Sequence, residues 1–322
     1  MAISKSHSSL GKHLTLMIAA PLALAAQLVF AAGDINFNAD TVYPEGVAYS
    51  VQQSAFLVGS IRHGTIGKVS LEGRYTRFIE DKALISSTGI FLDAKRNTLW
   101  VANGDVGGSV QSSPATQGKL AAVAAYDATS GARKGYYDLS GLVPGGHFAN
   151  DITVDDKGNV YVTDSFSPVI YRVDTAGKAS VFVRDTRFTG EGFNLNGIVY
   201  HPDGYLLVNK HNSGEIFRIS VGDKTQIDAV KLPEALKGAD GMVLREPGVL
   251  SLVQNGDANR ALELVSTDGW KSASIRSTRK STYAFPTAAA VSGSDLYILN
   301  ARLDSLLTPD APKVSDFVLQ KY

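Results

Sequence analysis

The sequence predicts an all-β fold, a six-bladed β-propeller with four antiparallel strands in each blade. Two observations predict it: one pattern recurs six times along the chain, and every copy contains short apolar strands separated by turn residues. Apolar residues make up 44% of the 322 residues and charged residues 19%, which is enough hydrophobic material for a large core. We therefore expect one large globular domain rather than a disordered chain.

Each copy of the pattern begins at a turn, enters an apolar strand, reverses through a polar hairpin and continues into a second apolar strand. One marker residue stands before the glycine, or the position equivalent to it, in every copy. The intervals between successive marker residues are 43, 62, 46, 44 and 46 residues, which is the length of a propeller blade in all but one case. The marker residues are Glu45, Thr88, Asn150, Asn196, Asp240 and Pro286.

The remaining strands of each copy follow from its turn residues. A hairpin such as Pro202-Asp203-Gly204 joins the first strand to the second, and a glycine marks the turn from the third strand to the fourth. Second strands are expected at 56–60, 99–103, 160–164, 206–209, 250–253 and 296–300. Third strands are expected at 67–71, 123–126, 169–173, 215–219 and 262–265.

The last copy is short of one strand, because only residues 316–320 form a clear strand after residue 300. Residues 34–42 precede the first copy and are the candidate for the missing strand. Pairing both ends of the chain in the last blade would leave no frayed terminal blade. The alternative interpretation is a β-sandwich in which the regular spacing is coincidental.

The first 31 residues have the composition of a signal peptide. Basic residues precede an apolar run from Leu14 to Ala32, and Val29 and Ala31 suit the positions before a cleavage site. We expect cleavage after Ala31, so that residues 32–322 form the propeller; the alternative is an uncleaved anchor. The chain contains no cysteine, and the expected location is periplasmic or secreted.

Charge composition limits the class of partner. Lys plus Arg equals Asp plus Glu at 31 each, so no net field attracts nucleic acid or an anionic membrane. We expect a small-molecule substrate, no nucleic acid, and no stable membrane association once the signal peptide is removed.

The marker residues predict a metal site. Propeller geometry places the start of every innermost strand around a central tunnel on one face. Two of the marker residues there are carboxylates and two are carboxamides, and such a set of oxygen donors suits a hard divalent cation such as calcium. The alternative interpretation is that Asn and Asp stand at these positions because turns favour them.

Four segments resemble the gluconolactonase/regucalcin family and its relatives diisopropylfluorophosphatase and paraoxonase, which are six-bladed calcium propellers. They are Pro44-Glu45-Gly46, Ala149-Asn150-Asp151, Leu195-Asn196-Gly197 and Ala239-Asp240-Gly241-Met242, and the resemblance covers essentially the whole chain after the signal peptide. It implies that a catalytic calcium ion, or another divalent cation, is held by Glu45, Asn150, Asn196 and Asp240.

The base that would activate water is left open among several residues. Asp240 could combine ligand and base roles, and Asp151, next to Asn150 in the sequence, lies beside the expected site. Histidine is the other candidate because its pKa lies near neutrality. We favour His147, three residues before Asn150, over His63 and His211. The expected catalytic residues are therefore Asp240, His147 and Asp151.

These features predict an exported, metal-dependent hydrolase of a lactone or similar ester. The alternative is a propeller without catalytic activity that binds a ligand or a protein. A strictosidine-synthase-like propeller would share the fold but lack the full ligand set. The long interval, residues 103–119, is expected to form either a lid over the site or a disordered loop.

Overall fold

The computed structural model describes residues 1–3, 33–222 and 224–322, and these contain 24 β-strands and one short helix, α1 (Leu303–Leu307). The chain divides into two units, Met1–Ala31 and Ala32–Tyr322. The predicted signal peptide falls in the first unit and, apart from residues 1–3, lies outside the described residues. Within the described residues, no helix is both long enough and apolar enough to cross a membrane.

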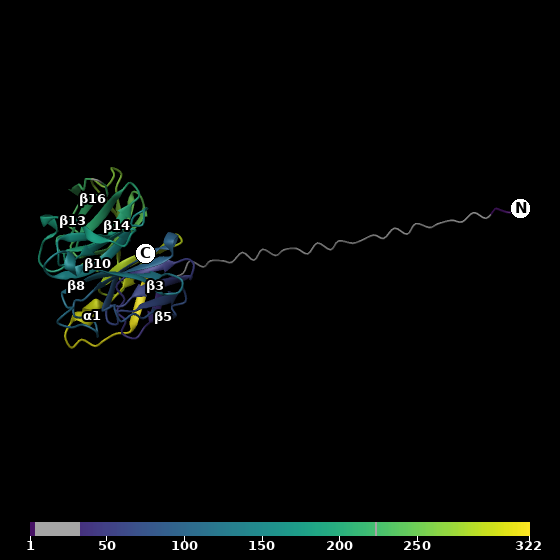
Figure 1. The fold of residues 1–322 in the computed structure, drawn as a ribbon, viewed down its shortest axis with the longest axis horizontal. Helices are drawn as coiled ribbons and strands as arrows, with labels where there is room; N and C mark the ends of the chain where they lie inside the picture. Colours follow the sequence, from purple (N-terminus) through teal and green to yellow (C-terminus); the bar gives the residue numbers. More distant parts are fainter. Residues whose placement is uncertain (4–32, 223) are drawn as a thin grey trace. The chain divides into compact units, whose positions relative to one another are not determined.

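The strands of residues 33–322 are drawn as arrows in Figure 1. Four of their hydrogen-bonded sheets contain four strands each. Three of them consist of consecutive strands and the fourth combines the two ends of the chain. The three are β2 (Val47–Ser50), β3 (Ala55–Gly59), β4 (Ile66–Ser70) and β5 (Tyr75–Ile79); β14 (Leu195–His201), β15 (Tyr205–Lys210), β16 (Glu215–Ser220) and β17 (Ile227–Ala229); and β18 (Ala239–Glu246), β19 (Val249–Gln254), β20 (Arg260–Val265) and β21 (Ser274–Lys280).

A fifth sheet contains eight strands, where the sequence predicts two sheets of four. The two halves are joined by a parallel pairing of only two residue pairs, His147 with Lys119 and Phe148 with Leu120. The pairing arises because the first two residues of the strand after the long loop, Lys119 and Leu120, lie beside the first two residues of the first strand of the next copy. The eight strands are β6 (Ser86–Asp93), β7 (Thr98–Gly104), β8 (Lys119–Asp127), β9 (Arg133–Asp138), β10 (His147–Val154), β11 (Val160–Asp164), β12 (Val169–Val173) and β13 (Ala179–Arg184).

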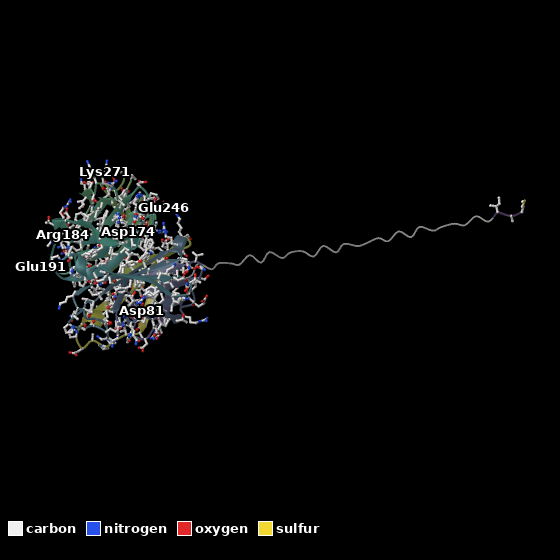
Figure 2. The ribbon with its side chains drawn as sticks, viewed as in Figure 1. Asp81, Asp174, Arg184, Glu191, Glu246 and Lys271 are labelled. Atoms are coloured by element: carbon white, nitrogen blue, oxygen red, sulfur yellow. The ribbon has the colours of Figure 1, made fainter. Side chains whose placement is uncertain are left out.

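The first strands of the copies contact one another in a closed ring. β2 contacts β6, β6 contacts β10, and the series continues through β14, β18 and β22 (Pro286–Ser292) back to β2. Charged side chains such as Arg184, Glu246 and Lys271 are exposed at the surface (Figure 2). The predicted all-β propeller is therefore confirmed.

The two ends of the chain close the ring. β1 (Ile35–Asn38) pairs antiparallel with β24 (Asp316–Lys321), which pairs with β23 (Asp295–Asn300) and through it with β22. Phe37 lies opposite Phe317, their ring centroids are 5.7 Å apart, and both side chains are buried. The predicted pairing of the N-terminal strand with the last copy is confirmed, with the strand shorter than residues 34–42.

Five of the innermost strands carry a β-bulge at the marker residue or at the residue after it. The register with the second strand shifts between Ser87 and Ile90 and at the equivalent places in β10, β14, β18 and β22. A bulge bends a strand and redirects the side chain that it carries, which is why bulges occur beside active sites. In β22 the bulged residue is Thr287, because Pro286 pairs with Asn300; the sequence placed Pro286 in the ring, and this prediction was wrong.

Glycine follows the marker residue where neighbouring strands approach closely. A Cβ atom on Gly197 would lie 2.3 Å from the backbone oxygen of Asp240, and one on Gly89 would lie 2.6 Å from the backbone oxygen of Asn150. No real side chain could occupy these places without moving the next strand. The glycines therefore set how tightly the inner strands pack around the axis.

The substitution Phe37→Ala tests the closure. Removing a buried aromatic side chain costs about 3–5 kcal/mol, and here it also removes the contact between the Phe37 ring of β1 and the Phe317 ring of β24. We expect urea unfolding to show a loss of this size in the free energy of unfolding. Val51→Ala, at a side chain that is 79% exposed, is the control and should change it by less than about 0.5 kcal/mol. Equal stability of Phe37→Ala and the parent protein would contradict the closure.

Candidate functional site

The four predicted metal ligands line one small cavity at the centre of the ring. Its volume is about 90 Å³, and Glu45, Asn150, Asn196 and Asp240 all contribute to its lining. Glu45 precedes β2, and the other three stand at the bulges of β10, β14 and β18. All four side chains are buried, with 4–9% of their surface exposed. The structure thus brings together four residues that are up to 195 positions apart in the chain.

Three of these side chains bury an oxygen atom that has no hydrogen-bond partner. They are Glu45 Oε2, Asn150 Oδ1 and Asn196 Oδ1. The amide nitrogen of Asn150 donates to Ser165 Oγ at 2.9 Å, so its oxygen is the atom left unpaired. A buried polar atom without a partner costs about 1–3 kcal/mol. Three at one place indicate that a group absent from the chain itself satisfies them.

The carboxylates of the site repel one another. Burial raises the pKa of Glu45 well above its ordinary value, and the nearby charges of Asp240 and Asp151 raise it further. Burial, followed by the charge of Asp151, likewise raises the pKa of Asp240. Among the described residues, the lining of this cavity includes no lysine or arginine that could balance them. A bound cation would reverse these effects.

The donor set fits a hard divalent cation. Two carboxylates and two carboxamide oxygens are ligands that calcium accepts, and calcium takes six to eight oxygens in all. In the described part of the chain, no three residues of the types His, Cys, Asp and Glu form a metal-binding group. Two of the four proposed ligands are asparagines, so the site at the centre of the ring is not a group of that kind.

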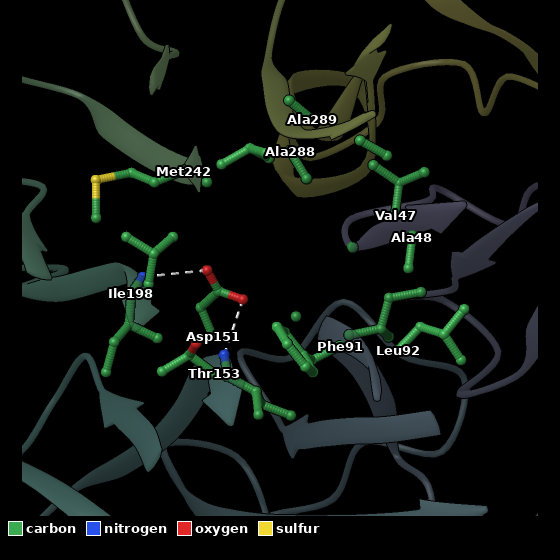
Figure 3. Close-up of a pocket in the computed structure, with 18 of the residues that line it drawn as sticks. Val47, Ala48, Phe91, Leu92, Asp151, Thr153, Ile198, Met242, Ala288 and Ala289 are labelled. Atoms are coloured by element: carbon green, nitrogen blue, oxygen red, sulfur yellow. Dashed lines mark hydrogen bonds between the residues drawn. The ribbon is translucent and has the colours of Figure 1, made fainter. Parts of the chain in front are cut away.

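The four proposed ligands, Glu45, Asn150, Asn196 and Asp240, together form what we call the polar ring. Asp151 lies on the other side of this ring from the small cavity and lines the central channel. The channel has a volume of about 350 Å³, and its lining is shared with the small cavity at Glu45, Asn196 and Asp240. Asp151 accepts hydrogen bonds from the backbone N–H groups of Ile152, at 2.8 Å, and Ile198, at 3.3 Å (Figure 3). Burial among apolar side chains raises its pKa to about 7. The structure therefore places this predicted catalytic residue beside the site but outside the cavity with the four ligands.

His147 is not brought to the site. Its Nδ1 lies 2.8 Å from Asp164 Oδ2 and its Nε2 lies 3.0 Å from the backbone oxygen of Val143, and it does not line the cavity. Both partners are acceptors, so the ring is satisfied when both nitrogens carry protons. The hydrogen bond to Asp164 accordingly raises the pKa of His147. An imidazole held in this way has no lone pair with which to accept a proton from water.

His63 also lies outside the cavity. Its Nε2 contacts the hydroxyl of Thr41 and the backbone oxygen of Asp40, both at 3.2 Å. Neither atom belongs to the lining of the cavity around the four ligands.

His211 is the histidine that lines the cavity. Its Nε2 lies 3.0 Å from Asn255 Oδ1, and the amide nitrogen of Asn255 donates to Asp240 Oδ2 at 2.5 Å. Because the amide nitrogen faces the carboxylate, the amide oxygen accepts from Nε2–H. The neutral ring therefore keeps its lone pair on Nδ1. Burial lowers the pKa of His211, which favours this neutral form.

Asn255 is a site residue that the sequence analysis missed, although a signal for it existed. In five copies, the backbone N–H of a residue just past the second strand bonds to a backbone oxygen at or just before the start of the first strand, at Ile61, Ser165, His211, Asn255 and Ala301. These five residues are therefore equivalent. Of them, Ile61, His211 and Asn255 line the cavity. Asn255 stands 15 residues after Asp240, as His211 stands 15 residues after Asn196, and this shared spacing would have identified it.

The long loop between β7 and β8 forms part of the cavity wall. Asp105, fully buried, accepts hydrogen bonds from the hydroxyls of Ser112 and Thr116, each at 2.6 Å, and from the backbone N–H of Gly107. The next residue, Val106, lines the cavity. The loop is therefore held by its own hydrogen bonds, and the expectation of a disordered loop was wrong. That it forms a lid over the site stays a prediction.

Comparison with known proteins identifies the fold. No protein-family model matches the chain, and no curated protein matches it in sequence. Solved structures do match. The major allergen Mala s 1 of Malassezia sympodialis has a TM-score of 0.72 and 19% identity, covering 90% of this chain and 95% of the other. A luciferin-regenerating enzyme has a TM-score of 0.63 and 15% identity, covering 90% and 95%.

Regucalcin of Agrobacterium tumefaciens strain C58, a calcium-binding protein, has a TM-score of 0.62 and 16% identity, covering 90% of this chain and 94% of the other. The likeness to regucalcin-type propellers that the four motifs imply is thus confirmed at the level of structure. At these identities the likeness establishes the fold alone.

The variant Asp151→Asn tests the charge cluster through the pH dependence of stability. Asp151 ionises near 3.8 when unfolded and near 7 when folded. Between these values the folded state retains a proton that the unfolded chain has released, so the calcium-free protein loses stability as the pH rises. The loss is on the order of 4 kcal/mol. Asp151→Asn should remove this contribution and leave the share of Glu45 and Asp240, whose pKa values are also raised. Urea unfolding followed from pH 4 to pH 8 with a chelator present measures the difference.

Asp203→Asn, at a carboxylate that is 73% exposed, is the matched control and should keep the pH dependence of the parent protein. A pH dependence identical in Asp151→Asn and the parent would show that Asp151 does not carry this charge effect.

Proposed function

We propose that this chain is a calcium-dependent hydrolase that opens a lactone or cleaves a similar carboxylic ester at the polar ring. One observation carries the proposal: four buried side-chain oxygen donors line one cavity, three of them with an unpaired oxygen, beside a histidine with a free lone pair. The likeness in fold to regucalcin, a calcium-binding protein, supports the choice of cation. We propose Glu45, Asn150, Asn196 and Asp240 as the ligands.

A bound calcium ion would polarise the ester carbonyl and stabilise the negative charge that develops on its oxygen. His211 acts as the general base. Its Nδ1 takes a proton from water as the water oxygen bonds to the carbonyl carbon, and it returns the proton to the leaving alkoxide when the carbon–oxygen bond breaks. Asn255 holds the ring in the required tautomer, and Asp240 holds Asn255.

We also propose that the ring has six blades. Two observations support this count: six first strands contact one another in a closed circle, and the eight-stranded sheet narrows to two residue pairs between β8 and β10. Divided there, the eight strands make two blades of four.

We further propose that the protein is exported to the periplasm or secreted. The basic, apolar and small-residue sequence of residues 1–31 and the absence of cysteine support this location.

The competing candidate is a propeller that binds a ligand without transforming it, with calcium in a structural role. A panel of lactones and carboxylic esters, assayed with and without chelator, distinguishes the two. Chelator-sensitive hydrolysis supports the proposal. Calcium binding without turnover of any compound would favour the binding scaffold.

Asp240→Asn should weaken calcium binding by more than about tenfold, because the number of charged ligands sets calcium affinity, and it should abolish hydrolysis. Titration calorimetry with calcium measures the first effect and the lactone assay the second. Asp203→Asn again serves as the control, with both properties unchanged. Calcium affinity retained in Asp240→Asn would show that the ligand set is wrongly assigned.

His211→Gln should lower kcat by about 10²–10⁴-fold, the usual contribution of a general base, while calcium affinity stays within a factor of about two. Asn255→Ala should lower kcat less, because the histidine remains but loses its orientation. Steady-state kinetics and calorimetry measure the two quantities on the same samples. A normal kcat in His211→Gln would return the role of base to one of the carboxylates.

A further inference from the structure

The walls of the cavity differ in chemistry from its floor. We call the four proposed ligands and Thr287 its floor and the other lining residues its walls; the polar side chains of the walls are His211 and Asn255. These two are already hydrogen-bonded to each other. The other side chains of the walls are all apolar, and they belong to Ile61, Val106, Phe148, Phe193, Phe285, Leu303 and Leu307.

This wall does not suit a substrate with many hydroxyl groups. Each hydroxyl that is buried without a partner costs about 1–3 kcal/mol. A sugar-type lactone would place several hydroxyls against side chains that offer neither a donor nor an acceptor. An alkyl or aryl substituent would instead gain about 25 cal/mol for each Å² that it removes from water.

The size of the cavity places most of the substrate outside it. About 90 Å³ is less than the roughly 150 Å³ of an apolar cavity that holds benzene. The cavity therefore holds the reacting carbonyl and the atoms next to it, and the rest of the molecule must extend over the rim.

One edge of the rim is apolar. Leu307 of α1 lines the cavity and is 42% exposed, whereas Leu303 and Leu306 of the same helix are buried. The loop after β7 packs directly on this helix, because a Cβ atom on Gly108 would lie 3.2 Å from a methyl group of Leu306. Leu307 is continuous with the apolar lining at Leu303 and Val106, so an apolar ligand group leaving the cavity would stay in contact with apolar side chains along this edge.

The other edge of the rim opens into a polar groove of about 750 Å³. The groove shares Phe193, His211 and Asn255 with the cavity. Some of its charges are paired internally, as Arg260 with Glu234 at 2.7 Å. A substrate with many hydroxyl groups would have to extend into this groove. Such a substrate is the alternative to one that extends along the apolar edge.

We propose that the substrate is an ester or lactone with an apolar chain, and that this chain lies along the edge formed by α1 and the loop after β7. The inference rests on the proposed hydrolase function and identifies its substrate class. Leu307 and Val106 are the side chains that set the preference for chain length.

The test compares δ-valerolactone, δ-octalactone, δ-decalactone and glucono-δ-lactone as substrates of the full protein with calcium. We expect kcat/KM to rise about tenfold or more from δ-valerolactone to δ-decalactone, as apolar contacts of this kind allow. Equal kcat/KM along the alkyl series, or a preference for glucono-δ-lactone, would overturn the proposal.

Leu307→Ser should raise KM for δ-decalactone by about fivefold to tenfold, with a smaller effect on each shorter chain. Val106→Thr, which replaces one methyl group by a hydroxyl of similar shape, should act in the same direction. Leu142→Ser is the matched control, since Leu142 is 37% exposed and does not line the cavity; its kinetics should equal those of the parent. An effect of Leu307→Ser that is the same for every chain length would contradict the proposed contact.

A binding measurement separates this inference from the hydrolase itself. The probes are δ-valerolactam and δ-decanolactam, which keep the carbonyl but resist hydrolysis, titrated calorimetrically in the presence of calcium. Tighter binding of the longer lactam, reduced by Leu307→Ser, supports the apolar edge even if no lactone is turned over. Equal binding of the two lactams overturns it even if the lactones are hydrolysed.

Discussion

The close packing of six first strands around one axis determines what the centre of this propeller can contain. Where the strands approach most closely, the backbone of one strand occupies the space that a side chain of its neighbour would need, as at Gly89 and Gly197. The bulge beside each glycine turns the preceding side chain toward the axis. Polar side chains from distant parts of the chain are therefore forced into one small volume that excludes most water. Their unpaired oxygens and raised pKa values follow from this crowding.

The features that the sequence predicted are those that depend on a repeat. The period of about 45 residues predicts the strands and the ring, and the marker residue of each copy predicts Glu45, Asn150, Asn196 and Asp240. The sequence analysis missed Thr287 because a one-residue bulge in β22 moves the ring position of the last copy from Pro286 to Thr287. This bulge is visible only in the pairing of β22 with β23. The closing strand was predictable because the last copy was short of one strand and residues 34–42 belonged to no other copy.

The histidines show where a repeat ceases to be informative. His147 stands three residues before a proposed ligand, but the start of β10 carries it into contact with Asp164 and away from the cavity. His211 stands 15 residues after Asn196, yet the hairpin returns it to the same mouth. Distance along the chain is a poor guide here, because the hairpin of each copy brings the end of its second strand beside the start of its first. Asp151 is the converse case, adjacent to a ligand in sequence but facing the opposite chamber.

The pairing of β1 with β24 also has a consequence for the order of folding. β1 is synthesised before any other strand of the ring and β24 after all of them, so their contact has the longest sequence separation in the fold. Contacts between consecutive strands can form while the chain is still growing, but β1 must wait with Ile35 and Phe37 uncovered. The last event is then the docking of two short apolar strands across a nearly complete ring. Such a step is slow for entropic reasons and leaves an exposed sheet edge until it occurs, which makes the nascent chain a natural client for chaperones.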